Sequence, residues 1–298
     1  MEFYNLGITI KELRIKKNIS QSELCHGICS QSQISKIEKG IIYPSSILLY
    51  QLSEKLGIDP NYIFALTQNK KLKYVENVKY VMRDCTKQKQ YKELYEIVEQ
   101  EKNENNFQSK EDKQFLIWHE AIARFHVNKS TKTALKLLNN ALKLTVTNSD
   151  FLSEREIDMM QAMAIFHWDN KEYEKSITIL KKCLTHFNKL DFPKDKEIKL
   201  KIIFNLAKIL GHEHQHEEAI KYHEMGIKFA INLNTFYMLG ELYYGKAWNL
   251  LKLKHSNEED IANNMEKALF IFELTENEGK LKIIKEQYFE KRNLKKPH

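Results

Sequence analysis

Residues 21–40 read QSELCHGICSQSQISKIEKG, and the interpretation of the whole chain starts from this stretch. Leu24 and Ile28 recur at helical spacing, and after a short turn Ile34 and Ile37 recur on a second helix that should end at Gly40. The second helix carries polar side chains between its apolar positions: Gln31, Ser32, Gln33, Ser35 and Lys36. Such side chains form hydrogen bonds with base edges and phosphates in a major groove. The pattern therefore predicts a helix-turn-helix whose second helix contacts DNA.

In detail the stretch resembles the Xre/Cro-type helix-turn-helix. Gln21 matches the glutamine at the start of the motif, and ISKIEKG at 34–40 matches its last residues. Pro44 follows the motif, as a proline does in that type. The resemblance implies a DNA-binding domain over residues 1–66, with Gln21 among the DNA-binding residues. Because one unit offers one recognition helix, specificity usually requires a dimer on palindromic double-stranded DNA, with half-sites roughly 34 Å apart or a multiple of it. The alternative is an ordinary helical pair with a polar outer face.

Three more helices are expected around this motif, over residues 6–17, 46–56 and 60–66. Ser20 and Glu23 have the spacing of a capping box, which would start the first helix of the motif. Ser45 or Ser46 can cap the next helix, and Gly57 should end it.

The composition favours an all-α fold. Nine Gly and four Pro in 298 residues are few, which disfavours a Gly-rich nucleotide-binding sheet and favours long helices with short turns. Four scattered cysteines do not suggest a disulfide framework or a zinc ribbon. No apolar run approaches the roughly 20 residues that span a bilayer, and the N-terminus lacks the features of a signal peptide. We therefore expect a cytoplasmic protein that does not enter membranes.

Positive charge is concentrated directly after the helix-turn-helix. Residues 1–66 carry seven Lys/Arg against six acids, whereas residues 67–92 carry eight against two. Within the second segment, residues 70–87 have an apolar face and a basic face. We interpret residues 67–88 as a basic linker helix; a charged helix that acts only as a spacer is the alternative.

Residues 89–298 have the pattern of a degenerate helical repeat. Long helices should begin near residues 110, 152, 195 and 235, which gives a period of roughly 40, and each is followed by a partner helix. Each partner helix contains a small residue followed by an aliphatic one, as tetratricopeptide (TPR) repeats do. We predict about five TPR-like pairs that form a superhelix, with a capping helix over residues 280–291. The concave wall of the superhelix would form a groove that binds a peptide.

Two patterns that resemble enzyme motifs are interpreted as accidental. His212, Glu213 and His216 satisfy HExxH, but they fall where the repeat predicts an exposed turn. Gly240 to Lys246 resembles a P-loop without its Ser/Thr or a preceding strand, so its glycines should instead let helices approach. We expect no enzyme activity, no catalytic residue, no metal and no cofactor. Trp118, Trp168 and Trp248 recur in successive first helices and are interpreted as core.

The combined features resemble the RNPP family of peptide-pheromone receptors. The resemblance is clearest in ISKIEKG (34–40) with YPS (43–45), CTKQKQYKE (85–93), FNLAK (204–208) and GELYY (240–244). It implies a homodimeric quorum-sensing regulator of transcription that binds DNA and a short signalling peptide with a free C-terminal carboxylate. A TPR scaffold for a protein partner, with little specific DNA binding, is the alternative.

The resemblance also implies peptide-binding residues. Lys87 and Lys89 match the two lysines that meet the peptide's acidic groups, and Asn205 matches a groove asparagine. The remaining candidates lie at other wall positions of the groove: His119, Gln161 and Glu241. Because related receptors have a glutamine at position 241, its carboxylate should disfavour an acid at that point of the ligand and indicates a different peptide.

Overall fold

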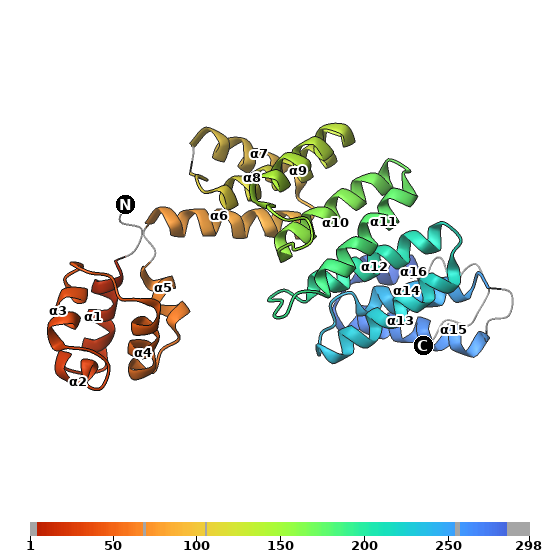
Figure 1. Ribbon diagram of the computed structural model, residues 1–298. Coiled ribbons are helices and arrows are strands. Elements are labelled where there is room, and N and C mark those ends of the chain that lie inside the picture. Colours follow the sequence, from red (N-terminus) through yellow and green to blue (C-terminus); the bar gives the residue numbers. More distant parts are fainter. Residues whose placement is uncertain (1–4, 68–69, 105, 254–256, 285–298) are drawn as a thin grey trace. The chain divides into compact units, whose positions relative to one another are not determined.

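The computed structural model describes residues 5–67, 70–104, 106–253 and 257–284, and these residues form helices and turns without a strand (Figure 1). The chain divides into two compact units. Unit 1 comprises Met1–Gln90 with Gln100–Phe107, and unit 2 comprises Tyr91–Glu99 with Gln108–His298. The expected all-α class is confirmed for the described residues.

Unit 1 contains the helix-turn-helix and the linker helix. Its helices are α1 (Leu6–Lys16), α2 (Gln21–Cys25), α3 (Gln31–Glu38), α4 (Ser46–Leu56), α5 (Pro60–Thr67) and α6 (Lys70–Lys87). The bounds of α1, α4 and α5 agree with the predicted ranges to within one residue. Helix α6 begins three residues after the predicted start of the linker helix at 67, and α2 ends at Cys25. Ile28 therefore lies in the turn, where it packs half-buried against the core.

The helix starts and ends of unit 1 follow from local side chains. Ser20 forms the expected capping box with Glu23, and Ser45 rather than Ser46 caps α4 by accepting a hydrogen bond from the Leu48 N–H. Gly57 ends α4 with φ of +63°, a conformation that a glycine adopts without strain. The core between these helices is aliphatic and is formed by residues such as Ile10, Leu24, Ile34, Ile37 and Leu52.

Helix α6 buries its apolar face at Val75 and Met82, which are 3% and 0% exposed. Within unit 1, a hydrogen bond joins α6 to the C-terminal end of α7 (Tyr91–Glu104). The Tyr74 hydroxyl donates to the Glu101 carboxylate at 2.5 Å. Residues 100–107 belong to unit 1, as α6 does.

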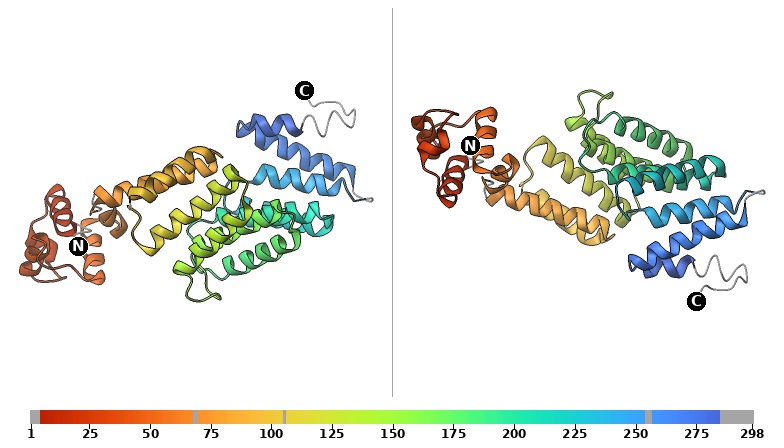
Figure 2. Two further views of the ribbon diagram at one scale, coloured as in Figure 1. Left: turned by 90° about the horizontal axis from the view of Figure 1, so that it is seen from above. Right: turned by 90° about the horizontal axis from the view of Figure 1, so that it is seen from below.

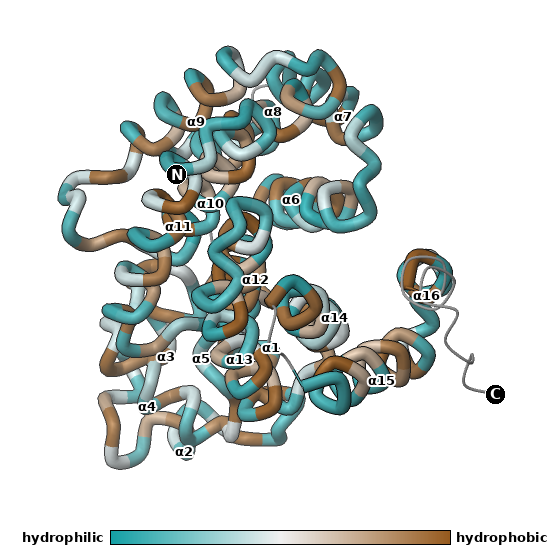
Figure 3. Tube along the Cα trace, turned by 90° about the vertical axis from the view of Figure 1, so that its right-hand side faces the viewer, coloured by the Kyte–Doolittle hydropathy of each residue, from teal (hydrophilic) through white to brown (hydrophobic). Residues whose placement is uncertain are grey.

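Unit 2 is a stack of helix pairs followed by a single helix (Figure 2). The helices are α8 (Lys110–Asn128), α9 (Thr131–Thr145), α10 (Glu154–Asp169), α11 (Tyr173–Phe187), α12 (Glu197–His212), α13 (His216–Asn232), α14 (Leu239–Leu250), α15 (Glu258–Leu274) and α16 (Glu278–Ile284). Each first helix packs on its partner, and α10, α12 and α14 also contact one another in sequence. Hydrophobic and hydrophilic residues alternate along these helices, as in helices that bury one face (Figure 3).

The predicted repeat is visible in the turns between paired helices. Lys129, Lys171 and His214 each have φ between +54° and +61°, at intervals of 42 and 43 residues. Five positions after each of them stands a small, fully buried residue: Ala134, Ser176 and Ala219. A small side chain there lets the second helix lie close against the first, and the Ser176 hydroxyl donates to the Ala164 carbonyl oxygen at 2.6 Å. The TPR-like pairing is thus encoded by a turn and a close contact.

The remaining fold predictions have mixed outcomes. Helix α16 begins two residues before the predicted capping helix, and the part of that prediction beyond Ile284 lies outside the described residues. All four cysteines are free, and three of them are buried. None of the described helices has the length and apolarity needed to cross a bilayer.

Candidate functional site

Helix α3 presents the polar face that the sequence predicts for a recognition helix. Ser30 caps it by accepting a hydrogen bond from the Gln33 N–H, and Ile34 and Ile37 are 0% and 1% exposed against the unit 1 core. The predicted DNA-binding side chains on this helix are exposed at Gln31, Ser32 and Lys36 and half-buried at Gln33 and Ser35. The buried face fixes the helix, and the polar face remains accessible.

The position of α3 is fixed by a polar cluster at its end. Arg14 donates to the Glu38 carboxylate at 2.6 and 3.0 Å and to the Ile19 carbonyl oxygen at 2.8 Å. Gln21 also donates to Glu38, at 2.7 Å, so its side-chain amide is engaged within the domain. Burial by itself would raise the pKa of Glu38, but the hydrogen bonds from Arg14 and Gln21 outweigh it and hold that pKa below its usual value. Glu38 is therefore a buried, paired carboxylate.

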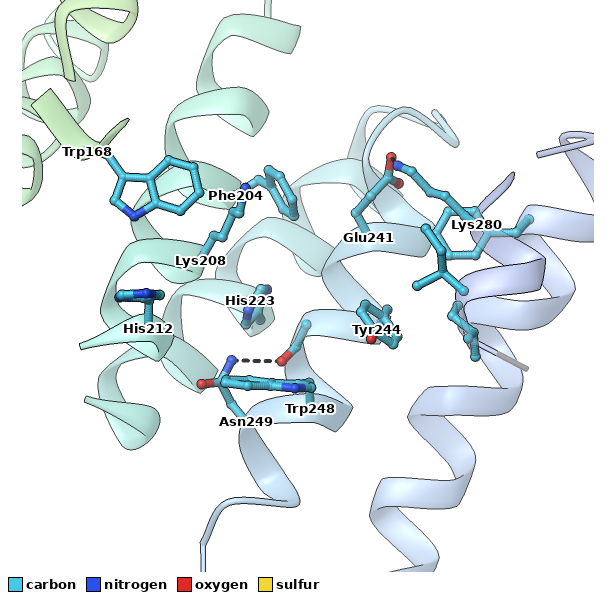
Figure 4. Close-up of a pocket in the computed structure, with 14 residues that line it drawn as sticks. Trp168, Phe204, Lys208, His212, His223, Glu241, Tyr244, Trp248, Asn249 and Lys280 are labelled. Carbon is cyan, nitrogen blue, oxygen red and sulfur yellow. Dashed lines mark hydrogen bonds and ion pairs between the residues drawn. The ribbon is translucent and has the colours of Figure 1, made fainter. Parts of the chain in front are cut away.

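A second candidate site is a pocket of about 390 Å³ in the C-terminal part of unit 2 (Figure 4). Its walls come from α10, α12, α13, α14, α15 and α16, so it lies where the first helices of consecutive pairs meet. Most of the wall is aromatic or aliphatic: Trp168, Phe204, Tyr244, Trp248, Phe272, Ile283 and Ile284. A concave, apolar site with a few polar groups is the usual form of a ligand pocket.

Charged side chains stand along this apolar wall. The Lys208 ammonium group lies over the Trp168 ring, 4.1 Å from its centroid. Lys280 of α16 forms an ion pair with Glu241 of α14 and lies 5.3 Å from the centroid of Phe272. The pocket wall thus carries two lysines and one glutamate beside its apolar side chains.

The pocket also contains a buried imidazole. His223 of α13 is 1% exposed, and neither ring nitrogen has a hydrogen-bond partner among the described residues. A Cβ atom added at Gly245 of α14 would lie 2.2 Å from the imidazole Cε1, so the glycine provides the space for this ring. Burial, with a smaller contribution from Lys246, lowers the pKa of His223 to about 3, which makes the ring neutral.

The predicted peptide-binding residues are not all in this pocket. Glu241 lines it, and Asn205 is half-buried next to the lining residue Phe204 without lining the pocket itself. His119 is 2% exposed and its Nδ1 is hydrogen-bonded to the Phe115 carbonyl oxygen, whereas Gln161 is 4% exposed.

Lys87 and Lys89 belong to unit 1, where both are exposed. Lys87 is the last residue of α6, and Lys89 has φ of +60° in the turn that follows.

Most of the pocket wall was not predicted from the sequence. Trp168 and Trp248 were noted at equivalent positions but were interpreted as core, whereas both are half-buried and line the pocket. Their recurrence in the first helices was the available signal. His223 and Gly245 had no such signal, because their relation depends on how α13 packs against α14.

The HExxH pattern lies in a turn, as expected. His212 ends α12, His214 has φ of +60°, and His216 begins α13, so the pattern is not inside one helix. Within the described residues no cluster of three or more His, Cys, Asp or Glu side chains could hold a metal ion.

Comparison with protein families finds a match for each part of the chain. Residues 79–292 match the RNPP family C-terminal domain, and residues 10–63 match a helix-turn-helix domain. The chain belongs to the RNPP family. It is a DNA-binding transcriptional regulator of the RNPP type, and because this family is non-enzymatic, the chain is not an enzyme.

Solved structures give the same fold. Bacillus thuringiensis PlcR, in complex with the peptide PapR7 and DNA, is 26% identical with a TM-score of 0.82, and the match covers 95% of this chain and 99% of that one. The SHP pheromone receptor Rgg2 of Streptococcus dysgalactiae is 19% identical with a TM-score of 0.66, over 96% and 99%. ComR from S. thermophilus, in complex with DNA and its signalling peptide ComS, is 17% identical with a TM-score of 0.61, over 94% and 97%. The last two likenesses concern the fold alone. Comparison with curated proteins gave no match.

Proposed function

We propose that this RNPP regulator acts in the cytoplasm as a homodimer on palindromic DNA and that a short signalling peptide with a free C-terminal carboxylate controls it. The observation that carries the peptide part is the pocket at the first helices of unit 2, with its aromatic wall and the polar side chains of Lys208, Glu241 and Lys280 along it. The 26% identity to PlcR over 95% of this chain, in a complex that contains a peptide and DNA, supports the proposal.

The DNA part of the proposal rests on α3. Its exposed Gln31, Ser32 and Lys36 offer the donors and acceptors that suit base edges and phosphates. One such helix contacts one half-site, so a dimer would read two half-sites about 34 Å apart or a multiple of that distance. The operator's symmetry would then mirror the symmetry of the dimer.

Peptide binding regulates transcription only if the peptide binds one state of the protein more tightly than the other. A hundredfold change in DNA affinity requires about 2.7 kcal/mol of such coupling. A pocket built from several successive helices suits this role, because a ligand that contacts all of them favours one arrangement of the stack.

The test is calorimetric titration of the full chain with synthetic penta- to octapeptides that have free C-terminal carboxylates. We expect micromolar binding to at least one peptide, and at least about tenfold weaker binding by Lys208→Glu, which reverses a charge in the pocket wall. Lys221→Glu is the matched control, because Lys221 is exposed on α13 and does not line the pocket.

The double variant Lys87→Ala, Lys89→Ala tests the residues proposed from the family resemblance. It should lose the peptide response and retain basal DNA binding. Peptide binding equal to that of the parent would show that neither lysine belongs to the peptide site. Absence of binding across the whole panel would contradict the peptide proposal and favour the alternative of a TPR scaffold for a protein partner.

A further inference from the structure

We propose that the unit 2 pocket is a subsite that selects a tyrosine side chain of the peptide over phenylalanine, and that His223 recognises the phenolic hydroxyl. This inference rests on the proposed function, because it specifies the chemistry of the ligand at the same site. It is carried by two buried polar side chains of the pocket, His223 and Trp168, that have no hydrogen-bond partner for their ring nitrogens among the described residues, and by the space that Gly245 leaves for the imidazole.

Two side chains of the pocket wall have buried nitrogen atoms without a hydrogen-bond partner among the described residues. These atoms are Nδ1 and Nε2 of His223 and the indole Nε1 of Trp168. Buried polar atoms nearly always have a partner in a folded protein. Both residues line the same pocket, so a ligand bound there is in the right place to provide it (Figure 4).

A phenolic hydroxyl matches the hydrogen-bonding groups of the buried imidazole. A neutral imidazole has one N–H donor and one acceptor nitrogen, and a phenolic hydroxyl can serve as either donor or acceptor. A tyrosine can therefore pair with whichever tautomer of His223 is present, while its ring packs against the aromatic wall. Phenylalanine would fill the same space without a partner for the imidazole, and an indole N–H could only donate.

The imidazole edge that carries both nitrogens of His223 lies against Gly245, which also lines the pocket. A Cβ atom at 245 would be 2.6 Å from Nε2 and 3.1 Å from Nδ1. Any larger residue at 245 must displace the ring. His223 is thus held in one place by the packing of α13 against α14, which is the condition for a specific hydrogen bond to a ligand.

The experiment compares two probes, N-acetyltyrosinamide and N-acetylphenylalaninamide, by ligand-observed NMR titration of the full chain at millimolar concentrations. We expect the tyrosine probe to bind about tenfold more tightly, the effect of a ligand hydrogen bond to a buried group. His223→Leu should bring the ratio of the two affinities close to one, whereas His223→Gln, which keeps a donor and an acceptor, should retain part of it.

His186→Leu is the matched control, since the Nδ1 of His186 is also buried and has no partner in the described part of the chain, but lies outside this pocket. It should leave the ratio unchanged. If His223→Leu does not fold, Gly245→Ala takes its place, because its Cβ displaces the same ring. Equal affinity of the two probes for the parent protein, binding of neither probe, or an unchanged ratio in the variants at 223 and 245 would overturn the inference.

The peptide panel separates this inference from the proposed function. Peptides that bind while the probe ratio is one would reject the tyrosine subsite and leave the peptide receptor standing. A probe ratio that depends on His223, together with no binding by any peptide, would support the subsite and contradict the peptide receptor.

Discussion

The ammonium group of Lys280 forms an ion pair with the carboxylate of Glu241, and both side chains line the unit 2 pocket. From the sequence, the carboxylate at 241 was expected to disfavour an acidic group on the ligand. The ion pair offsets that negative charge, because the partner cation stands on the neighbouring helix α16.

Substitution of either member of this pair should change ligand preference in opposite directions. In Glu241→Gln the charge of Lys280 is no longer offset, so peptides with an acidic side chain should bind about threefold more tightly, and in Lys280→Gln about threefold more weakly. Both effects should shrink at high salt, because the pair is partly exposed. Calorimetry at low and high salt measures this. A neutral peptide of equal length is the control, and an equal change for both peptides would contradict a charge effect.

The ion pair between Arg14 and Glu38 should stabilise the helix-turn-helix. Arg14→Met would leave the Glu38 carboxylate, whose side chain is 2% exposed, buried without its cation. Loss of one partner of a buried pair typically costs about 3 kcal/mol. Hydrogen exchange in peptides that cover α1 and α3 should therefore accelerate strongly, while peptides from unit 2 should exchange as in the parent. Protection of α3 equal to that in the parent would show that the pair is not needed.

Glu38 should also make the helix-turn-helix sensitive to acid. The pKa of Glu38 in the folded domain is lower than in the unfolded chain, where a glutamate has a pKa of about 4.3. The stabilisation is therefore complete above the unfolded pKa and is lost as the pH falls through the lower folded pKa. Exchange protection of α3, measured from neutral pH to about pH 3 with correction for intrinsic rates, should fall less steeply in Glu38→Gln than in the parent. Parallel pH profiles would assign the acid sensitivity to other groups.

Gly7 should be essential to the position of the recognition helix. A Cβ atom at this position would lie 1.9 Å from the carbonyl oxygen of Ile37, so α1 and α3 could not keep their present approach. Gly7→Ala should destabilise the domain by about 2 kcal/mol, the usual cost of overpacking. Gly279→Ala is the control, since a Cβ at 279 meets nothing within 4 Å. Hydrogen exchange in peptides that cover α3 measures the loss of stability. Protection of α3 in Gly7→Ala equal to that in the parent would contradict the prediction.

The helices could be predicted from the sequence because local chemistry sets their bounds. Ser20 with Glu23 and the αL glycine Gly57 act within a few residues, so their effects are visible without a tertiary structure. The error at Ile28 has a local cause as well. The apolar spacing continues through Ile28, but the helix ends at Cys25, since the C-cap residue His26 has ψ of 122° and Gly27 after it has φ of +76°. Spacing alone does not show such a break.

The pocket was harder to predict because spacing does not reveal what covers a helix face. Trp168 and Trp248 recur as core residues would, yet their faces border the pocket instead of being fully covered. Conversely, His119 and Gln161 were expected on the groove wall and are nearly buried. The closeness of His223 to Gly245 depends on the packing of two helices, which a single sequence does not specify.

The recognition helix offers a final prediction that separates specific from general DNA contacts. If Gln33 contacts a base, Gln33→Ala should weaken operator binding by about 1–3 kcal/mol and affect random DNA far less. Lys36, which is exposed on the same helix, should contact phosphate. Lys36→Ala should therefore weaken binding to both DNAs and reduce the slope of the logarithm of the binding constant against the logarithm of salt concentration by about 1. Fluorescence anisotropy on both duplexes across a salt series measures these effects. Equal losses on both duplexes for Gln33→Ala would show that Gln33 contacts only the backbone.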